Sequence, residues 1–130
     1  MAIKNIKTIK ELNLKNYGKT FSVELISNDG GIYEKMAQGV ITFNEEEFNI
    51  YIFTGIFKKK YSGAVLNYKF NEIKDVNFGK YGFKHPYIQL FVDEERYLIF
   101  SYYYQVKDYL EQEKNIKDFF DCLVEIEVEI

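Results

Sequence analysis

The chain has 130 residues and a formal net charge of only −3 at pH 7, and 47% of its residues are hydrophobic. This length fits one domain, residues 1–130, with enough apolar surface for a core, so a disordered chain is excluded. The weak charge gives no global field that would attract nucleic acid, and we expect no nucleic-acid partner.

Residues 1–19 are expected to form an extension or a short helix before the first strand. Isoleucine recurs at every third position from Ile3 to Ile9, a spacing that suits a helix better than a strand. This segment is basic, whereas the chain from Asp108 onward is acidic. We interpret the two charged ends as solvated faces, with a head-to-tail self-contact as the alternative.

Residues 20–102 are expected to form about six or seven antiparallel strands. Short runs alternate apolar and polar side chains, as half-buried strands do, and polar turns separate them. The strongest turn is residues 28–31 (Asn-Asp-Gly-Gly), because these residue types tolerate positive φ. Residues 77–82 contain two glycines and are expected to bend twice. The expected strands are 20–26, 33–43, 48–53, 65–70, 87–92 and 97–102.

One amphipathic helix is expected at residues 114–125. Asn115 is its expected N-cap, with Asp118 as a weak capping-box partner. Residues 124–130 alternate apolar side chains with glutamate, so an edge strand after the helix stays open as an alternative. The apolar stripe of the helix consists of Ile116, Phe119, Phe120, Leu123 and Val124.

Several strands followed by one helix form an order of elements that resembles the pleckstrin-homology-like (PH-like) superfamily, in its bacterial and GRAM-like forms. The likeness is carried by residues 39–43 with 48–51, by residues 68–76, and by residues 97–100 followed by the helix. The resemblance implies a mainly β fold, in which a small antiparallel barrel is capped at its open end by the helix.

The same resemblance implies a scaffold whose members bind lipids, peptides or other subunits, so the fold leaves the ligand open. Phosphoinositide-binding members carry a cluster of lysine and arginine in the first loop between strands. The corresponding turn here carries Asp29 and no basic residue, which argues against specific inositol-phosphate binding.

Lys58, Lys59 and Lys60 form the only basic run, and Tyr61 follows them directly. Three ammonium groups beside an aromatic tip could hold the phosphate headgroups of an anionic membrane surface. Each lysine contributes only about 1 kcal/mol near such a surface, so a solvated turn is the competing interpretation.

Tyr102, Tyr103, Tyr104 and Tyr109 supply more aromatic surface than one core is expected to absorb. Tyrosine is enriched at protein interfaces because it buries a large area and keeps a polar tip. Acidic residues such as Asp108 lie close by in the sequence and argue against base stacking. We therefore consider these tyrosines a candidate protein-contact surface.

No catalytic residue, metal site or cofactor is expected. His85 is the only histidine, so it can build neither a multi-histidine metal site nor, without a nucleophile nearby, a triad. Cys122 is the only cysteine, lies one position off the helix stripe, and is expected to be partly buried and inert. The acidic runs 45–47 and 93–95 are interpreted as solubilising loop tips.

A cytoplasmic location is expected. No apolar run approaches the roughly 20 residues that span a bilayer, and residues 1–12 lack the apolar block of a signal peptide. Abundant lysine, with Arg96 as the only arginine, is typical of an AT-rich bacterial coding sequence.

The sequence favours a non-enzymatic binding or scaffolding module that acts through protein contacts, with a protein partner or a second copy of the chain. The alternative is peripheral binding to a membrane or an anionic lipid headgroup through the lysine run. An enzyme with an unusual carboxylate and tyrosine site is a third hypothesis.

Overall fold

Seven strands form one antiparallel sheet in the computed structural model, which describes residues 19–29, 31–32, 37–54, 60–81 and 85–128. They lie in the order β5-β4-β3-β1-β8-β7-β6, and the two-residue β2 pairs with the end of β1. The strands are β1 Thr20–Asn28, β2 Gly31–Ile32, β3 Gln38–Phe43, β4 Glu47–Thr54, β5 Lys60–Lys69, β6 Asp75–Tyr81, β7 His85–Phe91 and β8 Tyr97–Tyr102.

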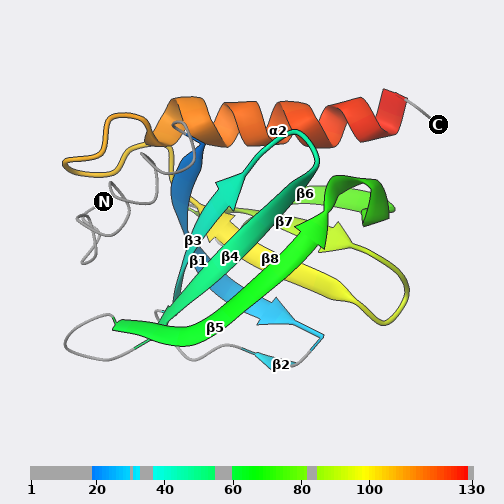
Figure 1. Ribbon diagram of the computed structural model, residues 1–130, viewed down its shortest axis with the longest axis horizontal. Coiled ribbons are helices and arrows are strands. Elements are labelled where there is room, and N and C mark those ends of the chain that lie inside the picture. The colour runs from blue at the N-terminus through cyan, green and yellow to red at the C-terminus, as the bar shows by residue number, and fades with distance from the viewer. Residues whose placement is uncertain (1–18, 30, 33–36, 55–59, 82–84, 129–130) are drawn as a thin grey trace.

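The central strand β1 joins two meanders, β3-β4-β5 on one side and β8-β7-β6 on the other. Figure 1 shows β3, β4 and β5 crossing in front of the other meander, with the helix α2 (Gln112–Val128) across one end of the sheet. The 3₁₀ turn η1 (Phe70–Glu72) connects β5 to β6, but these two end strands do not pair with each other. The predicted mainly β fold with a C-terminal helix is confirmed, and its sheet is curled but open.

Asparagine and aspartate side chains close two of the hairpins. Asn44 Oδ1 accepts hydrogen bonds from the backbone N–H groups of Glu46 and Glu47, at 2.8 and 2.9 Å, between β3 and β4. Asp93 does the same between β7 and β8, where the N–H groups of Glu95 and Arg96 donate to it. These two donors lower the pKa of Asp93. The predicted final hairpin is therefore confirmed, with residues 92–96 between its two strands.

The core lies between the concave face of the sheet and α2. Phe119 is fully buried, and rings of β1, β3, β4 and η1 surround it. Its ring centroid lies 5.0 Å from that of Phe48 and 5.1 Å from that of Phe21. Ile116 and Leu123 are also buried, and Phe120 packs against the same cluster. The predicted apolar stripe is therefore confirmed for these four residues.

Two expectations about element boundaries are wrong, and the alternative of an edge strand over residues 124–128 is excluded. The helix begins at Gln112, so Asn115 lies inside it and is no N-cap. No glycine or proline follows Leu123 within the helix, so the helix continues to Val128 and residues 124–128 form no edge strand. Residues 77–81 belong to β6, where Gly79 is required because a Cβ there would lie 2.5 Å from the ring of Tyr87.

The two charged ends meet at one point within the chain. Lys19 Nζ lies 3.0 Å from Asp118 Oδ2, which also accepts a hydrogen bond from Lys114. The hydrogen bond from Lys19 is the main cause of a lowered pKa at Asp118. The predicted helix or extension at residues 1–18 lies outside the described residues, as do residues 33–36 of an expected strand. No helix in the described part of the chain is long and apolar enough to cross a membrane.

Candidate functional site

The structure places part of the lysine run. Lys58 and Lys59 lie outside the described residues, and only the backbone of Lys60 is described, paired with Thr54 at the start of β5. Tyr61 is 47% exposed, and its ring centroid lies 5.9 Å from that of Tyr51 on the outer face of the sheet. The lysine site for anionic headgroups stays a prediction.

The structure separates the four candidate tyrosines. Tyr102 is buried in the main core, and Tyr109 is buried in a second cluster on the outer face of the sheet, with Val40 and Phe53. Tyr103 is half-buried, and Tyr104 is exposed. These residues therefore form no single patch, and Tyr104 is the only one of the four that is exposed, at 39%.

The buried polar side chains near the start of α2 bind the backbone of β1. The strand β8 ends at Tyr102, opposite Val23, so β1 continues beyond it without a strand neighbour on that side. The Gln112 amide fills this gap, because its Oε1 accepts from the N–H of Ser22 at 3.0 Å and its Nε2 donates to the carbonyl of Ser22 at 2.7 Å. One side chain thus extends the ladder of the sheet.

One turn further along the helix, Asn115 Nδ2 donates to the carbonyl oxygen of Thr20 at 2.6 Å. The hydroxyl of Tyr109 donates to the same oxygen at 2.5 Å. Gln112 and Asn115 lie three residues apart and so share a helix face. This anchor fixes α2 on β1, and the sequence analysis missed it.

The tyrosine hydroxyls near this anchor hold their protons more firmly than an exposed tyrosine does. Burial raises the pKa of Tyr109 well above its usual range. Burial and a 2.7 Å hydrogen bond to Glu24 raise the pKa of Tyr103 to about 12. Both hydroxyls therefore remain protonated and serve as hydrogen-bond donors.

A row of aromatic side chains runs from β6 across α2 to the end of β8. Ring centroids lie 5.1 Å apart between Phe78 and Phe120, 5.0 Å between Phe120 and Tyr102, and 5.7 Å between Tyr102 and Tyr104. Lys117 Nζ lies 5.8 Å from the ring centroid of Tyr104. We call the four rings the aromatic row.

Phe78 is the open end of the aromatic row. It lies on the concave side of the sheet, across from the buried Ile88 in the register of β6 and β7, yet it is 55% exposed. β6 pairs only with β7, so every second residue of β6 directs its N–H and C=O groups away from the described sheet. The row therefore borders a free strand edge.

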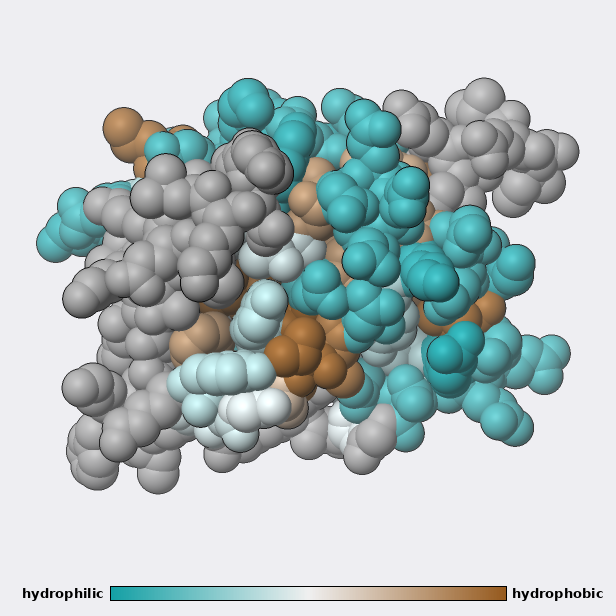
Figure 2. Space-filling view, in the orientation of Figure 1, coloured by the Kyte–Doolittle hydropathy of each residue, from teal (hydrophilic) through white to brown (hydrophobic). Residues whose placement is uncertain are grey.

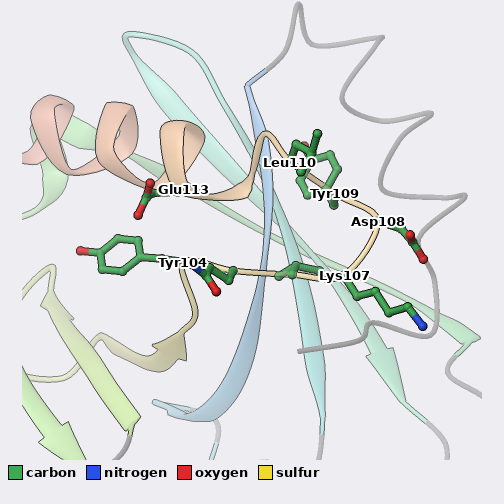
Figure 3. A pocket seen from close by; sticks show the side chains of 8 residues that line it. Tyr104, Lys107, Asp108, Tyr109, Leu110 and Glu113 are labelled. Atoms are coloured by element: carbon green, nitrogen blue, oxygen red, sulfur yellow. The ribbon is translucent and has the colours of Figure 1, made fainter.

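A hollow of about 470 Å³ lies at the other end of the row, between the first turn of α2 and the loop that precedes it (Figure 3). Tyr104 and Glu113 line it on the helix side, and Lys107 lies toward the far end of the loop. The loop turns at Asp108, whose φ is +66°. Leu110 at its rim is 95% exposed.

The remaining candidate residues for metal binding or catalysis lie apart from one another in the sequence. It contains no group of three or more histidine, cysteine, aspartate or glutamate side chains that could hold a metal ion. Cys122 forms no disulfide and is partly buried, as predicted. His85 begins β7, where its backbone pairs with Tyr81.

Comparisons of the chain with protein-family models, with curated proteins and with solved structures found no match in any of the three. The class that the structure defines is therefore a mainly β domain, with an antiparallel sheet and a C-terminal helix that packs on it.

Proposed function

We propose that this protein is a non-enzymatic, PH-like binding module that takes up an extended segment of a partner protein along the free edge of β6. The order of elements supports the PH-like assignment, because seven strands precede a helix whose stripe fills the space inside the curled sheet. The non-enzymatic part follows from the PH-like assignment, because members of that superfamily serve as scaffolds that bind lipids, peptides or other subunits.

The exposure of Phe78 is the observation that carries the proposal. Single exposed apolar side chains are common on protein surfaces. Phe78 differs because it combines a place on an edge strand with a position on the concave side, where it continues into an apolar row through Phe120. A strand added to β6 would form main-chain hydrogen bonds, and every second side chain of that strand would face the concave side beside Phe78. Main-chain pairing then gives affinity, and the aromatic contact selects an apolar residue in the partner.

A peptide selection tests the proposal directly. A displayed random peptide library is selected on the immobilised protein, and an enriched peptide is added to isotope-labelled protein for NMR. We expect backbone amide shifts along β6 and in α2 near Phe120. The Phe78→Ser variant should bind the peptide at least about tenfold more weakly, since it loses the aromatic contact that the bound peptide would cover.

Tyr61→Ser is the matched control, because Tyr61 is exposed to a similar extent but lies in β5, at the opposite edge of the sheet and on its outer face. This variant should bind the peptide as the natural chain does. The proposal fails if no peptide is enriched, or if Phe78→Ser folds normally and still binds an enriched peptide with full affinity.

A further inference from the structure

The second free edge of the sheet, along β5, has a different character from β6. β5 pairs with β4 alone among the described strands. Between Lys60 and Lys69 the strand carries no charged residue. Natural sheets usually protect a long edge with charges or proline, because unpaired backbone groups invite another strand. β5 has such protection only at its two ends.

The side chains on the outer face of this edge are also open to solvent, whereas Tyr68 on the concave face is buried. Val65 is 44% exposed and Tyr61 is 47% exposed, and these are two of the five large apolar side chains exposed in the described part of the chain. Figure 2 shows an apolar patch in the middle of this face, over β4 and β5, with polar side chains around it. The edge therefore combines free backbone groups with apolar surface.

Only part of β5 is straight enough to pair. The register with β4 shifts between Tyr51 and Phe53, so residues 62–64 form a bulge. The hydroxyl of Ser62 closes this bulge by donating to the carbonyl of Ile52 at 2.8 Å. A bulge twists an edge away from pairing. Residues 65–69 lie in continuous register opposite residues 47–51, and they form the usable edge.

We propose that this edge pairs with the β5 of a second copy of the chain, antiparallel and centred on Asn67. The centre follows from pairing all five straight residues of both copies. In an antiparallel pair, residue 65 then lies opposite residue 69 of the second copy, residue 66 opposite 68, and residue 67 opposite 67. The result is one sheet that continues across two molecules. This inference does not depend on the proposed function, because it uses the opposite edge of the sheet.

The pairing places compatible side chains opposite one another. Asn67 meets its own counterpart, and Leu66 meets the second copy's Tyr68 on the concave side, an aliphatic–aromatic cross-strand pair. On the outer side Val65 of each copy lies opposite Lys69 of the other copy, so this pair occurs twice. Within its own copy Lys69 already lies across from Glu47. No like charges face each other, so no electrostatic repulsion opposes the pairing of the edge with itself.

The charge pattern gives the sharpest test, because one position can be changed in two opposite ways. Val65→Lys places a like charge opposite the second copy's Lys69 at two symmetric places, whereas Val65→Glu places an opposite charge there. Sedimentation equilibrium should show a dimer with a dissociation constant on the order of 100 µM, since five paired residues bury less than the ~1,000 Å² of a stable interface. Val65→Lys should raise this constant roughly tenfold, and Val65→Glu should lower it by a similar factor. Both effects should shrink at high salt.

A cross-link tests the centre of the pairing. In a Cys122→Ser background, Asn67→Cys should form a disulfide-linked dimer on mild oxidation, because directly opposite Cα atoms in an antiparallel pair lie roughly 4.5–5.5 Å apart. Val65→Cys is the control and should cross-link poorly with itself, since its expected neighbour is the second copy's Lys69.

Three outcomes would overturn the inference. The first is a chain that stays monomeric at millimolar concentration. The second is a dimer that both Val65 variants weaken equally. The third is a dimer that Phe78→Ser abolishes and Val65→Lys leaves intact, which would assign self-association to β6 and leave the proposed function standing.

Discussion

Truncating Gln112 to alanine is expected to lower the free energy of unfolding by about 3 kcal/mol. The Gln112 amide is fully buried and makes three hydrogen bonds, two with the backbone of Ser22 and one to the carbonyl oxygen of Tyr103 at 3.0 Å. Alanine leaves one N–H and two carbonyl groups without this partner. Each unpaired buried group costs about 1 kcal/mol or more, which gives the expected total.

Urea unfolding followed by tyrosine fluorescence and circular dichroism measures this loss, since the chain has no tryptophan. The denaturant dependence of the free energy should stay unchanged, because the same surface is exposed on unfolding. Gln112→Glu keeps the shape and one acceptor but aims a carboxylate at two carbonyl oxygens. Burial raises the pKa of such a carboxyl, so this variant should be less stable at pH 7 than at pH 5. If Gln112→Ala lowers the free energy of unfolding by less than about 0.5 kcal/mol, the reasoning is refuted. The backbone groups of Ser22 and Tyr103 would then be hydrogen-bonded without the Gln112 side chain.

Three further predictions follow from packing and protonation. Phe119→Ala should lower the free energy of unfolding by about 3–5 kcal/mol in the same assay, and a loss under about 1 kcal/mol would contradict the buried position of its ring. Gly79→Ala should destabilise the fold by about 1–3 kcal/mol because its Cβ would overlap the ring of Tyr87, and Tyr87→Ala should relieve most of that cost in a double-mutant cycle. The pKa of Tyr103 is raised to about 12, so its contribution is complete below pH about 10 and is lost as the pH rises through its folded pKa. Tyr103→Phe should reduce the late phase of an ultraviolet absorbance titration by about one tyrosine and leave the part that belongs to Tyr109. An unchanged late phase would contradict a protonated Tyr103 hydroxyl bound to Glu24.

Features set by local sequence could be predicted from the chain alone. The stripe of Ile116, Phe119 and Leu123 repeats with the period of a helix, and the residues are buried together because a helix has only one such face. The final hairpin was also predictable, since a turn such as 93–96 is encoded by the side chains within it. Both predictions depend on residues a few positions apart.

The candidate site depends on register and therefore escaped the sequence. Gln112 is needed only because β8 stops at Tyr102 while β1 continues, and no local pattern reports where two distant strands end relative to each other. Phe78 lies beside Gly79, and a glycine at this position favoured the prediction of a turn. In the structure Gly79 lies within β6, where the ring of Tyr87 occupies the space that a side chain would need. Signals did exist in retrospect, because Gln112 and Asn115 are polar residues at helix spacing on the side that faces the sheet.

The anchor of α2 also sets an order of events during synthesis. Thr20 leaves the ribosome early, but the Asn115 amide that binds its carbonyl is made 95 residues later, and Gln112 follows Ser22 by 90. The first strand emerges with polar backbone groups that nothing yet translated can satisfy, and contacts this distant in sequence form slowly. This side of the central strand must therefore wait until Gln112 and Asn115 have been released, and until then it stays open to chaperones or to premature association.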